Sequence, residues 1–129
     1  MKRALLDTSF VIALARGEDP PLEDPPEEAA ISAVTLCGLH QGVLIATDKQ
    51  RPGRLATLIL AERRFDALPI DTRVAPHYGR LVAEARRSRN KKLATADALI
   101  AATAAAYQLP LITRDHDFAD IDGIDTLIV

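Results

Sequence analysis

The residues best suited to chemistry in this sequence are aspartates that stand next to apolar segments. Asp7 directly follows an apolar run at 4–6, and Asp115 comes two residues after another at 110–113. Runs of this length and composition are typical of buried β-strands. In open parallel sheets, ligands bind beyond the carboxyl ends of the strands, which lie about 4.8 Å apart. Two carboxylates held there repel each other unless a cation or a proton compensates.

Two further aspartates extend this group. Asp97 lies in the first turn of a helix predicted from Thr95 to about Gln108, whose apolar sequence indicates burial, and Asp117 lies two residues beyond Asp115. Each acid alone has a simpler explanation, because aspartate forms turns, caps helices and complements the helix dipole. Acids from three separate apolar contexts at one sheet edge, however, supply the oxygen ligands that Mg²⁺ prefers.

Other catalytic chemistries have less support in the sequence. There is no G-x-S-x-G motif and no glycine-rich phosphate loop. Ser9 stands where the D-x-D motif of haloacid-dehalogenase-like phosphatases has its second aspartate. Cys37 is expected to be a small core residue. Zinc is not favoured, because no HxxH or HExxH spacing joins the three histidines, His40, His77 and His116.

Length and composition favour a single soluble domain over residues 1–129. The chain has 129 residues, of which 48% are hydrophobic, and a net charge of −2. A chain of this size buries roughly two-thirds of its unfolded surface on folding. One cysteine excludes an internal disulfide and a cysteine-based zinc site. The sequence has no apolar run of about 18 residues and no secretory signal core, so we expect a cytoplasmic protein without a membrane span.

The elements that would position the acids alternate between strands and helices. Short apolar runs predict strands at 4–6, 29–32, 67–71, 110–113 and 126–129. Apolar periodicity and end signals predict helices at 10–16, 34–45, 52–64, 72–89 and 95–108. Thr8 or Ser9 is expected to cap the first helix and Thr95 the last. This order predicts an α/β fold with a mostly parallel central sheet, in which Pro69 marks an edge strand.

Four segments of the chain resemble the signature blocks of PIN-domain ribonucleases. They lie at 5–9, 31–36, 96–104 and 111–118. Their order and spacing span the chain and look in particular like the VapC toxins of type II toxin–antitoxin systems. The resemblance implies a PIN-like α/β/α sandwich. It also implies a Mg²⁺- or Mn²⁺-dependent endoribonuclease that cleaves cellular RNA by metal-assisted hydrolysis.

The resemblance further implies roles for individual residues. It matches the metal-binding acids of the family to Asp7, Asp97 and Asp115. It matches an additional catalytic acid, present in many members, to Asp117. Hydroxyl groups that commonly support the site match Thr8, Ser9 and Thr113. The implied partner is a VapB-like antitoxin whose C-terminal segment blocks the site, and a homodimer or a toxin–antitoxin hetero-oligomer is expected.

The charges of the chain are segregated. Residues 18–28 contain six acids and four of the eight prolines, which predicts a loop, and leave 12 acids against 16 bases elsewhere. Five of these bases fall within seven residues: Arg86, Arg87, Arg89, Lys91 and Lys92. They are either phosphate contacts for RNA or a solvated helix end that complements the helix dipole. With few aromatic residues in the chain, recognition is expected to rest on RNA shape and phosphate.

One position departs from the family pattern. The second block of the family usually has a glutamate of the acidic cluster where this chain has Gly38. Glycine inside a helix costs about 1 kcal/mol relative to alanine, so the residue is also unexpected on physical grounds. Gly38 has two possible origins. It is either a natural change that weakens metal binding, or a substitution that was engineered or selected. The second origin is favoured, because an active toxin is difficult to produce. The alternative function is a catalytically impaired PIN fold that binds RNA or its antitoxin.

Overall fold

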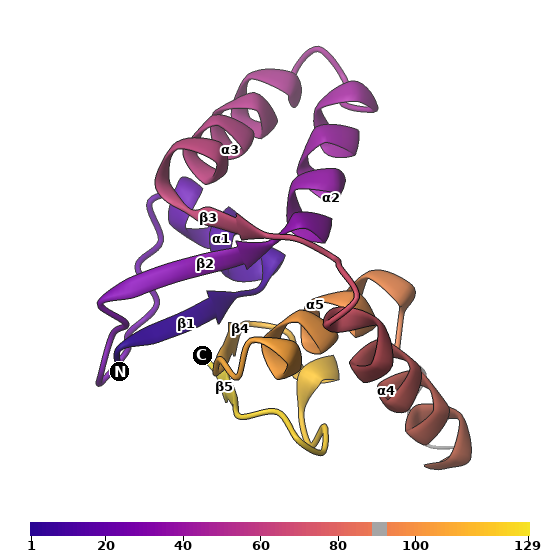
Figure 1. Ribbon diagram of the computed structural model, residues 1–129. Helices are drawn as coiled ribbons and strands as arrows, with labels where there is room; N and C mark the ends of the chain where they lie inside the picture. The colour runs from indigo at the N-terminus through magenta and orange to yellow at the C-terminus, as the bar shows by residue number, and fades with distance from the viewer. Residues whose placement is uncertain (89–92) are drawn as a thin grey trace.

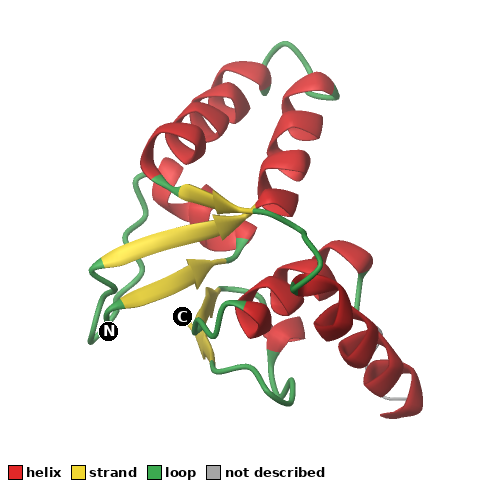
Figure 2. Ribbon diagram, viewed as in Figure 1, coloured by secondary structure: helices red, strands yellow, loops and turns green. Residues whose placement is uncertain are grey.

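A five-stranded parallel sheet forms the centre of the computed structural model, which describes residues 1–88 and 93–129 (Figures 1 and 2). The strand order is β3-β2-β1-β4-β5, and all four pairings are parallel. The strands are β1 (Arg3–Leu6), β2 (Glu28–Ser32), β3 (Asp66–Leu68), β4 (Leu111–Thr113) and β5 (Thr126–Ile128). The predicted parallel sheet is therefore confirmed, with β3 at one edge.

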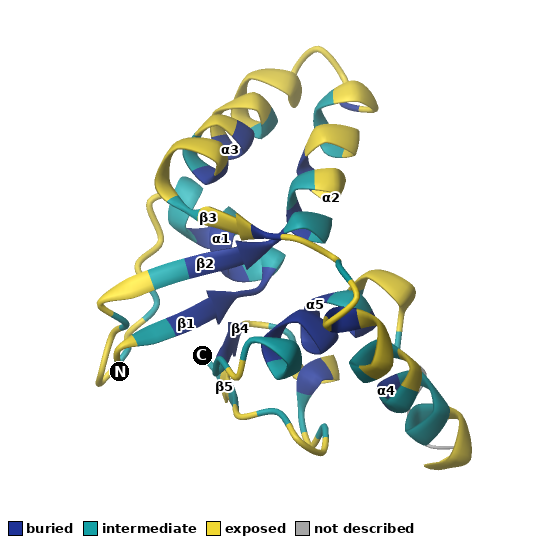
Figure 3. Ribbon diagram, viewed as in Figure 1, coloured by how far each residue is buried: buried dark blue, intermediate teal, exposed yellow. Residues whose placement is uncertain are grey.

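Helices cover both faces of this sheet. They are α1 (Thr8–Ala15), α2 (Ala33–Leu44), α3 (Arg51–Arg64), α4 (Val74–Ser88) and α5 (Thr95–Ala106), with a short 3-10 helix η1 (His116–Phe118). Successive residues of β1 point to opposite faces, so Leu5 packs with the α4 and α5 side and Leu6 with the α1 and α3 side. Two apolar cores result, one on each face, and the predicted α/β/α sandwich is confirmed (Figure 3).

The central strands of the sheet are buried from solvent because helices cover them on both faces. Leu5, Ile31, Leu111 and Ile112 have no exposed surface. Strands buried on two faces read as continuous apolar runs, which explains why the short runs at 4–6 and 110–113 predicted them correctly. Among the residues that the structure describes, no helix is both long and apolar enough to cross a membrane.

Several predicted element boundaries differ from the structure. The edge strand β3 ends at Leu68, just before Pro69, because proline cannot donate to a strand ladder. Helix α4 begins at Val74, not at residue 72, because Asp71 closes a turn by accepting the N–H groups of Arg73 at 3.0 Å and Val74 at 3.0 Å. The predicted end of this helix at residue 89 lies outside the described residues.

The predicted helix caps were wrong. Helix α1 has Asp7 in the N-cap position and Thr8 inside its first turn, with no side-chain cap bond. Helix α5 has Ala94 in the N-cap position, so Thr95 is its first helical residue and caps nothing. The carbonyl of Ala94 accepts the N–H of Ala98 at 2.9 Å, and the acid in the first turn is Asp97. The residue at which the helical backbone begins decides which residue is the cap, and residue type alone does not determine that point.

The prediction for Cys37 was also wrong. This thiol is exposed, because α2 buries Thr35 and Leu39, which lie one turn apart on its inner face. Cys37 lies midway between them in the chain and so points to the opposite side of the helix. The helix is apolar around most of its circumference, so the sequence did not distinguish the buried face.

Candidate functional site

The predicted sheet edge brings Asp7 and Asp115 together. Strands β1 and β4 are neighbours, with Leu6 in register with Ile112. The N–H of Asp7 continues this ladder and donates to the carbonyl of Ile112 at 2.9 Å. Asp115 follows two residues after the end of β4. Both acids therefore lie at the carboxyl end of the sheet, as the sequence predicted.

Two hydroxyl groups hold the carboxylate of Asp7. Its Oδ2 accepts hydrogen bonds from the Oγ of Ser9 at 2.7 Å and from the Oγ1 of Thr113 at 2.7 Å. Asp7 is only 3% exposed, so these bonds replace the water that a carboxylate would otherwise need. Ser9 and Thr113, expected to support the site by resemblance alone, thus make direct contact with its first acid.

The same hydroxyls order the segment that carries the remaining acids. The Oγ1 of Thr113 accepts the N–H of Asp115 at 2.9 Å, and Ser9 Oγ accepts the N–H of Arg114 at 3.1 Å. Asp115 Oδ1 in turn accepts the N–H of Asp117 at 2.9 Å and caps η1. These hydrogen bonds fix the backbone of the segment after β4 relative to the end of β1.

Three carboxylates converge in front of this sheet edge. Asp97, Asp115 and Asp117 each offer one oxygen, and these oxygens lie within 4.8 Å of one another. Asp97 comes from the first turn of α5, and the other two come from the segment after β4. Asp7 is not a member of this trio in the described geometry, but it lies near enough for its charge to act on Asp97. The trio thus contains Asp97 and Asp115 of the predicted metal ligands, but it has Asp117, expected only as an additional acid, in place of Asp7.

The electrostatics of the cluster are unfavourable without a counter-charge. Burial, and after it the negative charges of Asp7, Asp115 and Asp117, raise the pKa of Asp97 to about 6. A raised carboxyl pKa means that the site disfavours the charged form of this carboxyl group. A divalent cation bound by the same oxygens would remove that penalty. An all-oxygen donor set with half-buried and exposed members fits a hard cation that keeps water ligands, such as Mg²⁺ or Mn²⁺.

Thr8 and Gly38 lie on the other side of Asp7, where α1 meets α2. The Oγ1 of Thr8 lies 3.0 Å from the Oγ1 of Thr35, and Gly38 follows Thr35 by about one helical turn. A Cβ atom added at Gly38 would meet no atom within 4 Å. The backbone there leaves room for a longer side chain, so packing does not explain the glycine.

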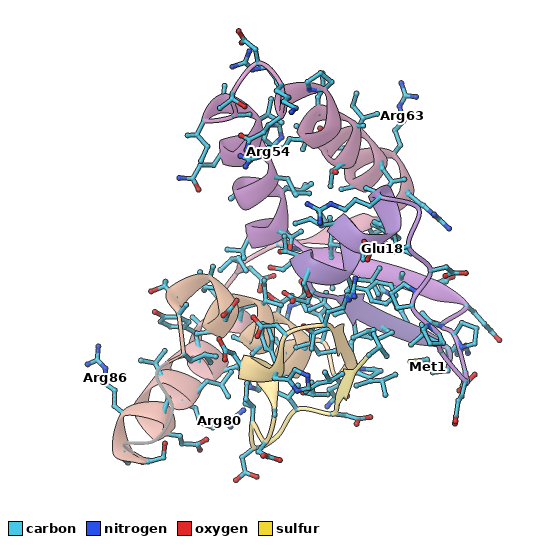
Figure 4. The ribbon with its side chains drawn as sticks, turned by 180° about the vertical axis from the view of Figure 1, so that it is seen from behind. Met1, Glu18, Arg54, Arg63, Arg80 and Arg86 are labelled. Carbon is cyan, nitrogen blue, oxygen red and sulfur yellow. The ribbon has the colours of Figure 1, made fainter. Side chains whose placement is uncertain are left out.

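The predicted basic segment is only partly described. Arg86 and Arg87 lie exposed in the last turn of α4, and Arg86 extends into solvent in Figure 4. Arg89, Lys91 and Lys92 lie outside the described residues. Among residues 1–88 and 93–129, no ion pair joins Arg86 or Arg87 to the acidic cluster, so their proposed contact with RNA phosphates stays a prediction. His116, next to the cluster, is exposed.

A different set of basic residues was missed by sequence reasoning. Arg16, Lys49 and Arg54 line a pocket of about 660 Å³ between α1, α2 and α3, which also contains Thr8 and Gly38. These three residues come from different elements and form no local charge run, so no sequence pattern could have found them. The acidic loop after α1 is tied to the site strand by an ion pair between Glu18 and Arg114.

Comparison with known proteins identifies the family of this chain. The profile of the PIN domain matches residues 4–124. Ribonuclease VapC5 from Mycobacterium tuberculosis is 39% identical over 120 residues, covering 92% of this chain and 87% of that protein. Ribonuclease VapC4 from the same organism is 30% identical over 129 residues, covering 100% of this chain and 98% of that protein.

Solved structures give the same assignment. VapBC-5 from Mycobacterium tuberculosis, a member of the VapBC family of toxin–antitoxin systems, has a TM-score of 0.82 at 34% identity, and the match covers 100% of both chains. A toxin–antitoxin complex from Klebsiella pneumoniae has a TM-score of 0.71 at 30% identity, covering 98% of this chain and 99% of that one. With the profile matching nearly the whole sequence and VapC proteins covering it at this identity, the chain belongs to the PIN-domain family and is of the VapC type.

Proposed function

We propose that this protein is a Mg²⁺- or Mn²⁺-dependent endoribonuclease and the toxin of a toxin–antitoxin pair, acting on cellular RNA in the cytoplasm. The observation that carries the proposal is the trio of carboxylates within 4.8 Å at the carboxyl end of the sheet. The similarity to proteins named ribonucleases supports the same reaction. We assign metal binding to Asp7, Asp97 and Asp115, with Asp117 as an additional catalytic acid.

The residues of the chain prepare this site in three ways. Ser9 and Thr113 fix the orientation of the Asp7 carboxylate by donating to its Oδ2. The first turn of α5 presents Asp97 to the oxygens of Asp115 and Asp117. Asp115 holds the backbone of Asp117 and so fixes the fourth acid. Geometry that is set before substrate arrives needs little reorganisation during the reaction.

A divalent ion bound there supplies positive charge to the scissile phosphodiester and lowers the pKa of a coordinated water. The chain's own contribution is to hold the carboxylates at fixed positions and to exclude water from the Asp7 side, where Asp7 is 3% exposed. Cleavage by water attacking the phosphorus, with the 3′ oxygen as leaving group, would give 5′-phosphate and 3′-hydroxyl ends.

The proposed partner is a VapB-like antitoxin, and the similar structures include proteins described as toxin–antitoxin complexes. A basic antitoxin side chain that entered the carboxylate cluster would be attracted by charge-assisted hydrogen bonds. Leu44 and Ile45, at the end of α2, are 82% and 71% exposed, which suits a contact with another protein chain. Either an antitoxin or a second copy of this chain in a homodimer could cover them.

A second candidate function follows from Gly38. If the missing glutamate is essential, the chain binds RNA or its antitoxin but does not cleave. A Cβ at Gly38 would meet no atom within 4 Å among the described residues, so no neighbouring side chain occupies the space of the expected glutamate next to the helix.

Cleavage of a structured RNA in Mg²⁺ or Mn²⁺, with and without EDTA, separates these functions. We expect cleavage that EDTA abolishes and that Asp97→Asn lowers at least about 100-fold, as loss of a metal ligand does. Asp120→Asn is the matched control, since Asp120 is an exposed aspartate of a nearby turn outside the trio, and Asn tolerates its positive φ of 59°.

A second readout does not depend on activity. Metal binding should raise the melting temperature of the wild-type protein and of Asp120→Asn, but not that of Asp97→Asn. Cleavage by Asp97→Asn or Asp7→Ala at the wild-type rate would refute the assignment. RNA binding without cleavage in either metal would favour the impaired, binding-only function.

A further inference from the structure

The pocket between α1, α2 and α3 has the composition of an anion-binding site. Its volume is about 660 Å³, and Arg16, Lys49 and Arg54 line it. Among the described residues that line it, none is Asp or Glu, and the others are apolar, small or neutral polar. An anionic ligand therefore meets three positive charges and no opposing carboxylate in the lining.

One of these cations is already positioned. The guanidinium of Arg54 donates to the carbonyl of Gly42 at 2.9 Å across the α2–α3 hairpin, and Figure 4 shows this side chain turned toward α2. Four N–H donors of the guanidinium remain for a ligand. Arg16 and Lys49 are exposed, and within residues 1–88 and 93–129 neither forms an ion pair. They are therefore available to a phosphate.

The pocket adjoins the carboxylate cluster through Thr8. Thr8 lines the pocket and is the next residue after Asp7, and Gly38 lines it from α2. A polynucleotide whose scissile bond lies at the cluster has neighbouring phosphates on both sides. The phosphates on the Thr8 side of Asp7 would enter a basic pocket.

A second pocket beside the cluster has several acidic residues in its described lining. This pocket, of about 540 Å³, shares Asp117 with the cluster and is lined by Glu84, Asp120 and Asp122 as well. Glu84 is ion-paired with Arg80, and the other three carboxylates of the described lining repel a phosphate backbone. The two pockets together favour one path for the substrate, on the side of α1, α2 and α3.

We infer that the pocket formed by Arg16, Lys49 and Arg54 binds backbone phosphates of the RNA segment next to the cleaved bond. This inference rests on the proposed nuclease function and names the surface by which that function holds its substrate. It differs from the expectation that the C-terminal end of α4, with Arg86 and Arg87, is the phosphate contact.

Charge reversal at the two exposed cations tests the inference. We would measure binding of a fluorescently labelled RNA hairpin in EDTA, over a series of salt concentrations, with the double variant Arg16→Glu/Lys49→Glu. The control is Arg63→Glu/Arg64→Glu, which changes the net charge equally in the exposed last turn of α3, where Arg63 extends into solvent (Figure 4). Arg86→Glu/Arg87→Glu tests the competing surface.

The pocket variant should bind the RNA at least about tenfold more weakly, with a salt slope lower by about 1.5–2 for its two lost contacts, whereas the control should change less than about twofold. The milder Arg16→Ala/Lys49→Ala should show the same direction if the reversal perturbs folding. Equal losses in the pocket variant and the control would overturn the inference, since they would indicate unspecific attraction. A loss confined to Arg86→Glu/Arg87→Glu would overturn it in favour of α4.

Two other results separate the inference from the proposed function. If the wild type cleaves RNA while the pocket variant binds it normally, the inference fails and the nuclease function stands. Unchanged RNA binding with lost antitoxin binding would also overturn it and make the pocket a protein-binding site. If the wild type neither binds nor cleaves RNA, the proposed function fails and the inference fails with it.

Discussion

Thr113 donates a 2.7 Å hydrogen bond to Asp7, a residue 106 positions earlier in the chain. The bond forms because β1 and β4 are adjacent parallel strands that end at the same edge of the sheet. The same Thr113 oxygen accepts the N–H of Asp115 at 2.9 Å. A single hydroxyl thus connects the first acid of the site to the segment that carries two others.

Thr113→Val should therefore disturb both stability and activity. The variant keeps the shape of the side chain but leaves the buried Asp7 carboxylate and the Asp115 N–H each short of one partner, a cost of about 1–3 kcal/mol in free energy of unfolding. We expect RNA cleavage to fall about tenfold, as for loss of a residue that orients a metal ligand. Urea unfolding and a cleavage assay measure the two effects.

Thr126→Val is the matched control for that variant. Thr126 lies on the neighbouring strand β5, and its Oγ1 is buried without a hydrogen-bond partner among the described residues. Its replacement by valine should leave the stability within about 0.5 kcal/mol or increase it. Equal destabilisation of the two variants would show that the bonds of Thr113 contribute nothing specific.

Gly38→Glu should increase metal-dependent cleavage, because it adds a carboxylate where a Cβ meets no atom within 4 Å. We expect a rise of about tenfold in the rate at limiting Mg²⁺. Gly38→Gln is the control, since it has the same size without the charge. Both should gain up to about 1 kcal/mol of helix stability over glycine. Cleavage unchanged by glutamate, or raised as much by glutamine, would contradict a missing ligand at this position.

Asp97→Asn should stabilise the metal-free protein at neutral pH. The pKa of Asp97 is raised in the fold from 3.8 to about 6, so the wild type loses stability as the pH rises through that window, and the loss persists above it. Near pH 4 the two proteins should be similar. At pH 7.5 the variant should be more stable by about 1 kcal/mol after allowance for solvent screening, or about 3–5 °C in Tm.

Thermal melts from pH 4 to 8 in EDTA check this prediction for Asp97. An Asn variant that melts below the wild type at pH 7.5 would show that the charge of Asp97 is compensated within the protein. Saturating Mg²⁺ should reverse the order at neutral pH, because the ion stabilises only the protein whose ligands bind it.

Ser32→Ala should destabilise the junction between β2 and α2. Ser32 has no exposed surface, accepts the N–H of Val34 at 3.3 Å as the N-cap of α2, and lies 3.1 Å from the hydroxyl of Thr103. Thr103 donates its own proton to Leu99, so Ser32 is the donor in the contact between the two hydroxyls. We expect a loss of about 1–2 kcal/mol.

Ser88→Ala, at the exposed end of α4, is the control for Ser32 and should change the stability by less than about 0.5 kcal/mol. Chemical denaturation of both variants measures the difference. If Ser32→Ala were as stable as the wild type, the two buried bonds would be replaced without cost, contrary to the expectation for a buried cap.

The sequence predicted the sheet and the acids because both depend on patterns that are local in the chain. Buried parallel strands are continuous apolar runs, and an aspartate beside such a run lies at a sheet edge wherever the strand is placed. Asp7 and Asp115 could be selected in this way, whereas Asp97 was selected from the first turn of an apolar helix and Asp117 from its position next to Asp115. The sequence could not show how each acid is held in the site, because the hydrogen bonds of Asp7 to Ser9 and Thr113 depend on which strands become neighbours.

The incorrect predictions have a common physical cause. Thr95 and Cys37 were assigned from residue type and local composition. The turn geometry decided that Ala94 precedes the first turn of α5, and the packing of α2 decided which of its apolar sides is buried. The basic pocket could not be predicted for the same reason. Arg16, Lys49 and Arg54 meet only after three helices have packed.

The central place of β1 has a consequence for synthesis of the protein. Residues 1–68 contain β1, β2 and β3, which pair with one another, whereas Asp97, Asp115 and Asp117 all come later in the chain. A ribosome-bound chain that has released only its first half can form three of the five strands but none of the carboxylate trio. The site closes only when β4 pairs beside β1, a contact of long sequence separation and therefore slow to form. The carboxylate trio can therefore assemble only after Asp117 has been translated.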